Sequence, residues 1–149
     1  MLFAQKIILC EGKDDIFAIR YYLEKSEVDI DAEGITFVDT GGKNNLPKYA
    51  DIAGKLNINW CAVTDEDKKD DLVDASTEGV RNKLEKLKTG KDLTIIWHGN
   101  LEASLNLQTG KADPEWQLKN INLKNLYDLI KTYPLYSGTC EKIKDWAAS

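Results

Sequence analysis

The sequence has little histidine and little cysteine, and both shortages limit its chemistry. His98 is the one histidine, which excludes a His-rich zinc site and any catalysis that needs two histidines. The three cysteines, Cys10, Cys61 and Cys140, are an odd number, lie far apart and form no Cys-x-x-Cys spacing. We therefore expect small buried thiols in a reducing compartment rather than a disulfide framework.

Long apolar runs and an excess of positive charge are also lacking. No run approaches the ~18 apolar residues that span a membrane, and acids follow the short apolar start too soon for a secretory signal. These absences predict no membrane partner and a cytoplasmic location. The net charge is −5, so bulk electrostatics cannot hold DNA, and metal ions and local lysines would have to offset the repulsion.

What the sequence does have is an alternation of short apolar runs with helical periodicity, which is typical of an α/β domain with a parallel sheet. We expect one domain over residues 1–149, with a core at about 3–107 and a helical C-terminal extension at about 113–149. About four parallel strands should be flanked by helices, and Asp14 should cap the first helix. The expected strands are 6–10, 35–38, 60–64 and 93–97, and the expected helices are about 15–25, 47–56, 77–87, 101–107, 123–133 and 140–147.

Carboxylates follow three of the four expected strands. The carboxyl ends of parallel strands meet at one edge of a sheet, so these acids should converge there. Close carboxylates repel one another, and a divalent cation with all-oxygen ligands, magnesium or manganese, removes that cost. A metal site is one interpretation, and acids that are merely solvated in exposed loops are the other. The five acids are Glu11 and Asp15 after the first strand, Asp65 and Asp67 after the third, and Glu102 after the fourth.

The segment Gly41-Gly42-Lys43 follows the second expected strand. Glycines there let backbone amides approach an anion, and the lysine adds a positive charge. The alternative is a simple turn with an exposed lysine. The sequence contains no G-x-x-x-x-G-K-[ST], which excludes a P-loop ATPase on this chain.

Four segments, in this order, resemble the TOPRIM domain, and most closely the nuclease domain of the OLD (overcoming lysogenization defect) family. FAQKIILCEGKDD resembles the family's first strand and Glu-Gly pair, and DTGGKNN its Gly-Gly-Lys turn. WCAVTDEDKKDD resembles the Asp-x-Asp strand, and NLEAS, at 100–104, the later glutamate motif. The resemblance covers roughly Phe3 to Leu105. EGKDD by itself also resembles the TOPRIM maturase that trims ribosomal RNA.

The resemblance implies a TOPRIM/Rossmann-like fold and a Mg²⁺- or Mn²⁺-dependent DNA endonuclease that hydrolyses phosphodiester bonds with two ions. One ion would activate a water and the other would stabilise the leaving oxygen. Glu11 and Asp65 would be catalytic, and Gly41, Gly42 and Lys43 would bind the substrate. The metal ligands would be Glu11, Asp15, Asp65, Asp67 and Glu102.

The same resemblance suggests binding partners and alternative functions. DNA is the expected partner. OLD proteins usually carry an ATPase domain ahead of TOPRIM. Because this chain starts at the first strand, we expect an excised domain or a stand-alone relative. A homo-oligomer is a further possible assembly. The rival functions are RNA processing or nucleotidyl transfer, and a non-catalytic TOPRIM module that only binds nucleic acid or partners. A receiver-like phospho-acceptor domain fits the acids poorly. The family's late catalytic lysine has no motif match among Lys119, Lys124, Lys142 and Lys144.

Overall fold

The computed structural model describes residues 5–65, 68–69, 72–73, 75–97 and 134–149. Its centre is a four-stranded parallel sheet in the order β2-β1-β3-β6, and a separate antiparallel hairpin joins β4 to β5. The expected sheet of about four parallel strands is confirmed. The strands are β1 (Lys6–Cys10), β2 (Ile35–Asp39), β3 (Asn59–Asp65), β4 (Lys68–Lys69), β5 (Leu72–Val73) and β6 (Leu93–Trp97).

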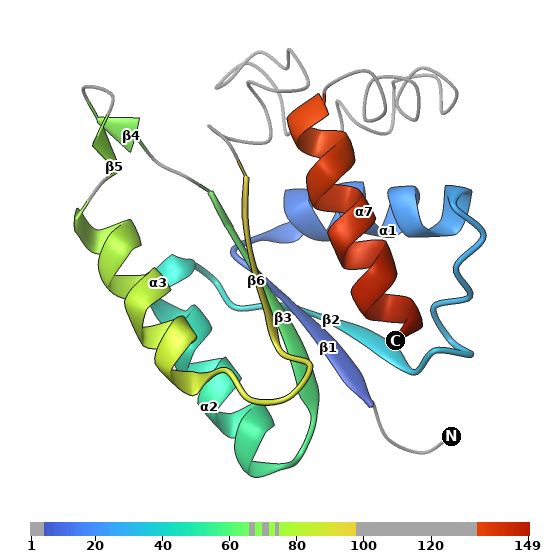
Figure 1. Cartoon of the computed structure of the whole chain (residues 1–149), viewed down its shortest axis with the longest axis horizontal. Helices are drawn as coiled ribbons and strands as arrows, with labels where there is room; N and C mark the ends of the chain where they lie inside the picture. Colours follow the sequence, from blue (N-terminus) through green and yellow to red (C-terminus); the bar gives the residue numbers. More distant parts are fainter. Residues whose placement is uncertain (1–4, 66–67, 70–71, 74, 98–133) are drawn as a thin grey trace.

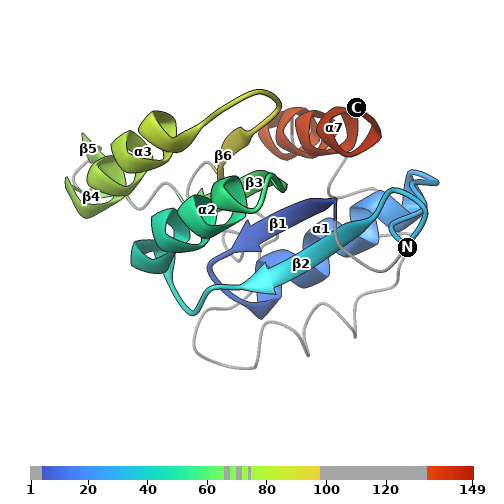
Figure 2. The same ribbon diagram turned by 90° about the horizontal axis from the view of Figure 1, so that it is seen from below.

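Helices cover both faces of the sheet. The helices α1 and α7 lie on one face, α2 and α3 lie on the other, and the β4–β5 hairpin projects beyond the start of α3 (Figure 1). Seen along the sheet, α1 lies beside β1 and β2, whereas α7 lies beside β6 (Figure 2). The helices are α1 (Lys13–Lys25), the short 3-10 helix η1 (Lys43–Asn45), α2 (Leu46–Lys55), α3 (Ala75–Leu87) and α7 (Pro134–Ala148).

Two apolar clusters fill the space between the sheet and its helices, because strands covered on both faces have apolar side chains on both. On the α2/α3 face, Trp60 of β3 is fully buried among small and branched side chains from both helices. The α1/α7 cluster includes Ile8, Cys10, Ile19, Tyr22, Leu23, Cys61, Val63, Ile95, Ile143 and Trp146, and the α2/α3 cluster includes Leu9, Leu46, Ala50, Ala53, Trp60, Ala62, Val80 and Leu84.

The C-terminal helix α7 is part of the core. Ile143, Trp146 and Ala147 are buried against the sheet and α1. The indole nitrogen of Trp146 donates to the carbonyl of Lys91 at 2.8 Å, just before β6. The hydroxyl of Tyr22 also donates to the carboxylate of Glu141, which ties α1 to α7. The last turn of α7 therefore lies at the amino edge of the sheet, opposite the edge where the acids were expected.

Several local predictions need correction. The helix α1 begins at Lys13 with Gly12, in extended backbone at φ −163°, at the cap position, so the prediction that Asp14 caps this helix was wrong. The helix α3 begins at Ala75, before the expected 77. The acidic, lysine-rich composition of 65–74 predicts a loop after β3, but β4 and β5 pair as short antiparallel strands within this stretch. The helices expected at 101–107 and 123–133 lie outside the described residues. No helix in the described part of the chain is both long and apolar enough to cross a membrane.

Candidate active site

The order of strands reverses at β1. The chain passes from β1 through α1 to β2 on one side, whereas β3 pairs with β1 on the other. In open parallel sheets, ligands bind outside the carboxyl ends of the strands at such a switch point. Cys10 pairs with Val63, so Glu11 leaves the sheet beside Thr64 and Asp65. Two of the three expected acidic segments therefore start at this switch point.

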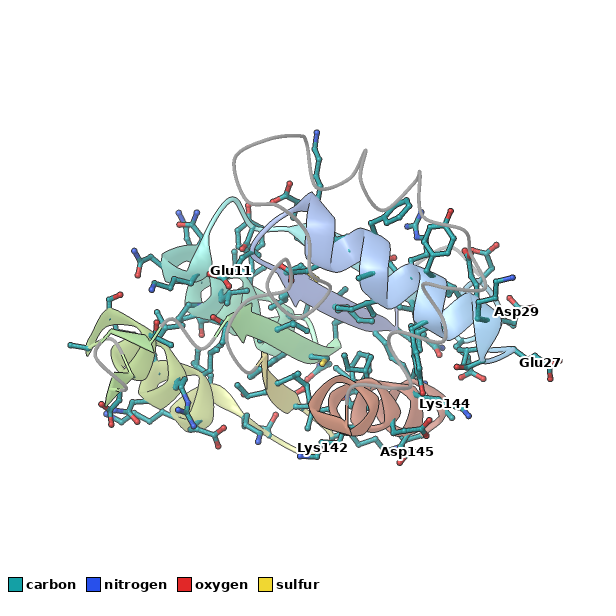
Figure 3. The ribbon with its side chains drawn as sticks, turned by 90° about the horizontal axis from the view of Figure 1, so that it is seen from above. Glu11, Glu27, Asp29, Lys142, Lys144 and Asp145 are labelled. Atoms are coloured by element: carbon teal, nitrogen blue, oxygen red, sulfur yellow. The ribbon has the colours of Figure 1, made fainter. Side chains whose placement is uncertain are left out.

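The side chain of Glu11 is held against the end of β3. The hydroxyl of Thr64 donates a hydrogen bond to Oε2 of Glu11 at 3.3 Å, and Thr64 itself is fully buried. Thr64 lies on the same face of β3 as Trp60 and Ala62, which is the α2/α3 face. Glu11 is half-buried at the carboxyl ends of the strands (Figure 3). This carboxylate is therefore oriented by the strand that carries Asp65.

Other carboxylates converge on the end of β1. Asp15, in the first turn of α1, is 6% exposed. Burial raises the pKa of the neighbouring Cys10 thiol well above its usual value, and the negative charges of Asp15, Asp39 and Glu11 raise it further. The Cys10 thiol therefore lies within electrostatic range of acids at the ends of two strands and at the start of a helix. Glu11 follows β1 and Asp15 lies in the first turn of α1, so both belong to the segment that leaves the carboxyl end of β1.

The predicted metal ligands are only partly described. Asp65 is the last residue of β3 and pairs with Trp97 of β6, but its side chain, like Asp67 and Glu102, lies outside what the structure describes. No group of three His, Cys, Asp or Glu side chains within the described residues could hold a metal ion. The two described candidates, Glu11 and Asp15, carry carboxylate oxygens near the end of β1, and oxygen donors of this kind suit a hard divalent cation.

The Gly-Gly-Lys turn is anchored to the end of β1. Gly41 has φ +76° and Gly42 has φ +147°, in the region that side chains disfavour and glycine allows. The buried Thr40 accounts for the anchoring: its amide donates to the carbonyl of Cys10 at 2.9 Å. Its hydroxyl lies 2.9 Å from that same carbonyl and 3.1 Å from the carbonyl of Gly42.

Two further side chains close the turn. Asp39 accepts a hydrogen bond from the amide of Gly41 at 2.9 Å, and the side-chain amide of Asn45 donates to the carbonyl of Thr40 at 2.8 Å. The backbone that leads into Lys43 is therefore fixed next to Glu11. Gly41 itself is exposed and Lys43 is half-buried.

Lys43 reaches across to a helix on the far side of β1. Its ammonium donates to the hydroxyl of Thr77 at 2.9 Å, and Thr77 is fully buried in the first turns of α3. This hydrogen bond links the turn after β2 to α3, the helix that follows the Asp-x-Asp segment, on the α2/α3 face of the sheet. Sequence reasoning identified Lys43 but neither Thr77 nor Thr64.

Two of the four candidates for the late catalytic lysine are described. Lys142 and Lys144 belong to the half of α7 that runs toward the amino edge of the sheet, and both stand well apart from Glu11 (Figure 3). Their helix ends against Lys6, the first residue of β1. This placement argues against both as partners of Glu11. Lys119 and Lys124 lie outside the described residues.

Comparisons with known proteins agree with this geometry. Residues 2–67 match the sequence model of the family "Overcoming lysogenization defect protein-like, TOPRIM domain". A curated relative, the OLD nuclease of Thermus scotoductus, is 30% identical over 133 residues, which cover 81% of this chain and 25% of that protein. The chain thus spans about a quarter of the length of this relative.

Two solved structures share the fold. The C-terminal region of the Burkholderia pseudomallei OLD protein superposes with a TM-score of 0.60 at 22% identity, covering 99% of this chain and 88% of that one. The C-terminal region of the Xanthomonas campestris pv. campestris OLD protein gives a TM-score of 0.56 at 18% identity, covering 99% and 98%.

The parallel sheet, with a glutamate after β1 and Asp-x-Asp from the end of β3, matches the pattern of a TOPRIM domain. Among TOPRIM domains, the chain is similar to that of the OLD family.

Proposed function

We propose that this chain is the nuclease domain of a DNA endonuclease that depends on Mg²⁺ or Mn²⁺ and hydrolyses phosphodiester bonds with two ions. The observation that carries the proposal is the position of Glu11, which is bonded to Thr64 at the switch point and lies near the anchored Gly-Gly-Lys turn. The relative named OLD nuclease supports the same reaction. Glu11, Asp15, Asp65, Asp67 and Glu102 are the proposed metal ligands.

Divalent ions, when bound, supply an activated water and stabilise the charge that develops on the phosphate. The residues of the chain do the rest. Glu11, oriented by Thr64, is placed to hold or accept a proton at one carboxylate oxygen. Asp65, at the end of the neighbouring strand, is the second proposed catalytic residue. The amide of Gly42 and the ammonium of Lys43 contact the phosphate backbone of the substrate, which supplies positive charge that the acidic chain otherwise lacks. Gly41, whose amide is bound to Asp39, provides the positive-φ turn that presents them.

The test is cleavage of supercoiled plasmid with magnesium, manganese or a chelator at low salt. We expect slow nicking that needs the divalent ion and falls steeply as salt rises, because few lysines contact phosphates. Asp65→Ala and Glu11→Ala should abolish the activity, and Lys43→Ala should weaken it less. Asp51→Ala is the matched control, since Asp51 lies on α2 and pairs with exposed Lys55, and it should cut as wild type does.

The outcome of this assay separates the proposal from its rivals. If structured RNA is cut while plasmid stays intact, the substrate class is wrong and the RNA-processing alternative is correct. If wild type cuts neither substrate but still binds DNA, the domain is a binding module in isolation.

A further inference from the structure

We infer that Thr77 is a positioning residue for Lys43, and that its hydroxyl holds the lysine ammonium where it meets a phosphate of the nucleic acid. The inference rests on the proposed role of Lys43 in substrate binding. It adds a residue from a different helix, 34 positions along the chain, that no motif in the sequence indicates.

The contact is short and sheltered. Nζ of Lys43 and Oγ1 of Thr77 are 2.9 Å apart, and Thr77 is fully buried. A hydrogen bond to an ionised donor is roughly twice as strong as one between neutral groups. A buried hydroxyl also needs a partner, because an unmade bond leaves its desolvation uncompensated. The ammonium and the hydroxyl thus stabilise each other at this point.

The other end of Lys43 is fixed independently. Its backbone follows Gly42 in the turn that Thr40 ties to the end of β1 and that Asn45 closes. A lysine side chain ordinarily loses much rotamer freedom when it binds a phosphate. With its backbone and its tip both held, Lys43 has lost that freedom before the substrate arrives, which favours binding through preorganisation.

A hydroxyl is well suited to this task. A carboxylate at position 77 would add a negative charge that competes with the phosphate, whereas a neutral hydroxyl orients the cation without adding one. An ammonium carries three donors, so the chemistry allows a hydroxyl and a phosphate oxygen to be bound at the same time. The hydrogen bond from Lys43 to Thr77 joins the turn after β2 to α3. The ammonium therefore lies on the same face of the sheet as Glu11 and Thr64.

The experiment is a double-mutant cycle on the whole chain with Thr77→Val, Lys43→Met and both together. The readouts are the Kd for a fluorescent DNA duplex, measured by anisotropy with calcium in place of magnesium, and the KM and kcat for plasmid cleavage. We expect Thr77→Val to raise Kd and KM roughly three- to tenfold, the size of one ordinary hydrogen bond. The effect is smaller than the full strength of a charge-assisted bond because Thr77 acts on the substrate only through Lys43. The kcat should change less than KM.

Three comparisons separate positioning from a purely structural role. Thr77→Ser should restore Kd to within about twofold of wild type, since it keeps the hydroxyl. In the Lys43→Met background, Thr77→Val should cause no further loss of affinity, whatever it does to the melting temperature. Thr36→Val, at an exposed threonine of β2, is the matched control and should leave Kd unchanged.

Each contrary result has a distinct meaning. A loss of affinity that persists in the Lys43→Met background, or that Thr77→Ser does not restore, overturns the positioning role. Wild-type affinity in Lys43→Met overturns it as well, because Lys43 then meets no phosphate. If the cycle gives the expected affinities while wild type cuts no plasmid, the positioning role stands and the proposed nuclease activity fails.

Discussion

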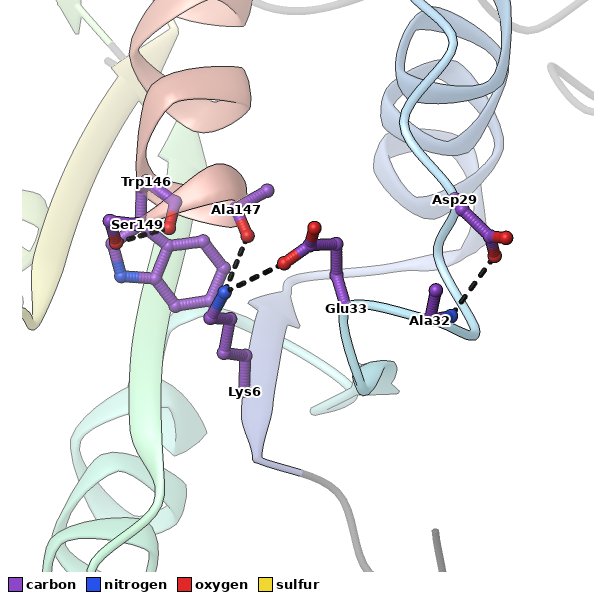
Figure 4. Close-up of polar contacts among 7 residues, drawn as sticks. All are labelled: Lys6, Asp29, Ala32, Glu33, Trp146, Ala147 and Ser149. Carbon is purple, nitrogen blue, oxygen red and sulfur yellow. Dashed lines mark hydrogen bonds and ion pairs between the residues drawn. The ribbon is translucent and has the colours of Figure 1, made fainter.

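The ammonium of Lys6, at the first residue of β1, donates to the carbonyl of Ala147, which lies 141 positions later in the last turn of α7 (Figure 4). The same ammonium pairs with Glu33 at 3.3 Å, and the Lys6 side chain is 9% exposed. The last carbonyls of a helix have no partner within the helix, and they carry the negative end of its dipole. One buried cation therefore caps α7 and ties it to the sheet.

Lys6→Met should consequently destabilise the protein. Methionine fills a similar space, but it leaves the carbonyl of Ala147 without its donor, so we expect a loss of about 1–3 kcal/mol in the free energy of unfolding. Urea unfolding measures the loss. Relative to wild type, the variant should show a larger increase in hydrogen-exchange rate at the amides of 141–148 than at other amides. Lys55→Met is the control, because Lys55 is 74% exposed in its pair with Asp51, and it should cost less than about 0.5 kcal/mol. Equal stability of Lys6→Met and wild type would contradict the capping role.

The two buried thiols make stability depend on alkaline pH. Burial raises the pKa of both Cys10 and Cys61 above the ordinary 9.0, so the folded chain keeps these protons after the unfolded chain has lost them. Below about pH 9 the thiols are protonated in both states and contribute nothing to the pH dependence. Above that pH, the free energy of unfolding should fall by on the order of 1 kcal/mol per pH unit for each thiol.

Denaturant titrations at pH 7 and pH 10 test this, with the Cys10→Ala/Cys61→Ala double variant as the reference. The double variant is expected to be less stable at pH 7 but to lose less stability between the two pH values. Parallel pH profiles for the two proteins would rule out the thiols as the cause. Folded wild type should also react slowly with thiol reagents at neutral pH, because a protonated, buried thiol is a poor nucleophile.

The sheet could be predicted from the sequence because apolar runs such as that of β1 admit few other structures at this length. The position of Glu11 at the carboxyl end of β1 follows from the parallel strands as well. The start of α1 could not. Asp14 has the residue type of a cap, but that preference is worth about 1 kcal/mol, and the packing of Ile19 and Leu23 on the sheet fixes the helix instead.

Contacts between distant segments could not be predicted from the sequence, for a different reason. Thr64 and Glu11 are 53 positions apart, and Lys43 and Thr77 are 34 apart. Threonine favours strands because of its β-branched side chain and is tolerated in helices, so nothing in the sequence marks these two. Their partners depend on which strands are adjacent and on where a helix starts relative to a turn, and both are properties of the folded chain.

Divalent ions should stabilise the protein if the carboxylates at the switch point bind them. Ligand binding to the folded state adds RT ln(1 + [L]/Kd) to its stability, about 1.4 kcal/mol at tenfold excess over Kd. For a domain of this size that corresponds to a rise of about 4–5 °C in the melting temperature. Thermal unfolding with millimolar manganese or magnesium measures it. Glu11→Ala and Asp65→Ala should each remove the rise, whereas Asp51→Ala should retain it. An unchanged melting curve for wild type in manganese would count against the site.

Thr64 should matter for cleavage through its bond to Glu11. Thr64→Val keeps the shape of the buried side chain but removes the donor, so Glu11 can rotate away from the orientation that β3 imposes. The bond is long at 3.3 Å, which favours a modest effect of about 1 kcal/mol, or roughly fivefold in kcat/KM. Thr64→Ser retains the hydroxyl and should cut nearly as well as wild type.

Thr94→Val is the matched control for Thr64→Val. The hydroxyl of Thr94 on β6 is buried and has no hydrogen-bond partner in the described part of the chain, so its removal should leave cleavage unchanged and raise stability slightly. If Thr64→Val and Thr94→Val cut equally well while Glu11→Ala is inactive, Glu11 is held by something other than Thr64. If Thr64→Val loses activity only in proportion to a fall in melting temperature, the threonine acts on stability and not on the carboxylate.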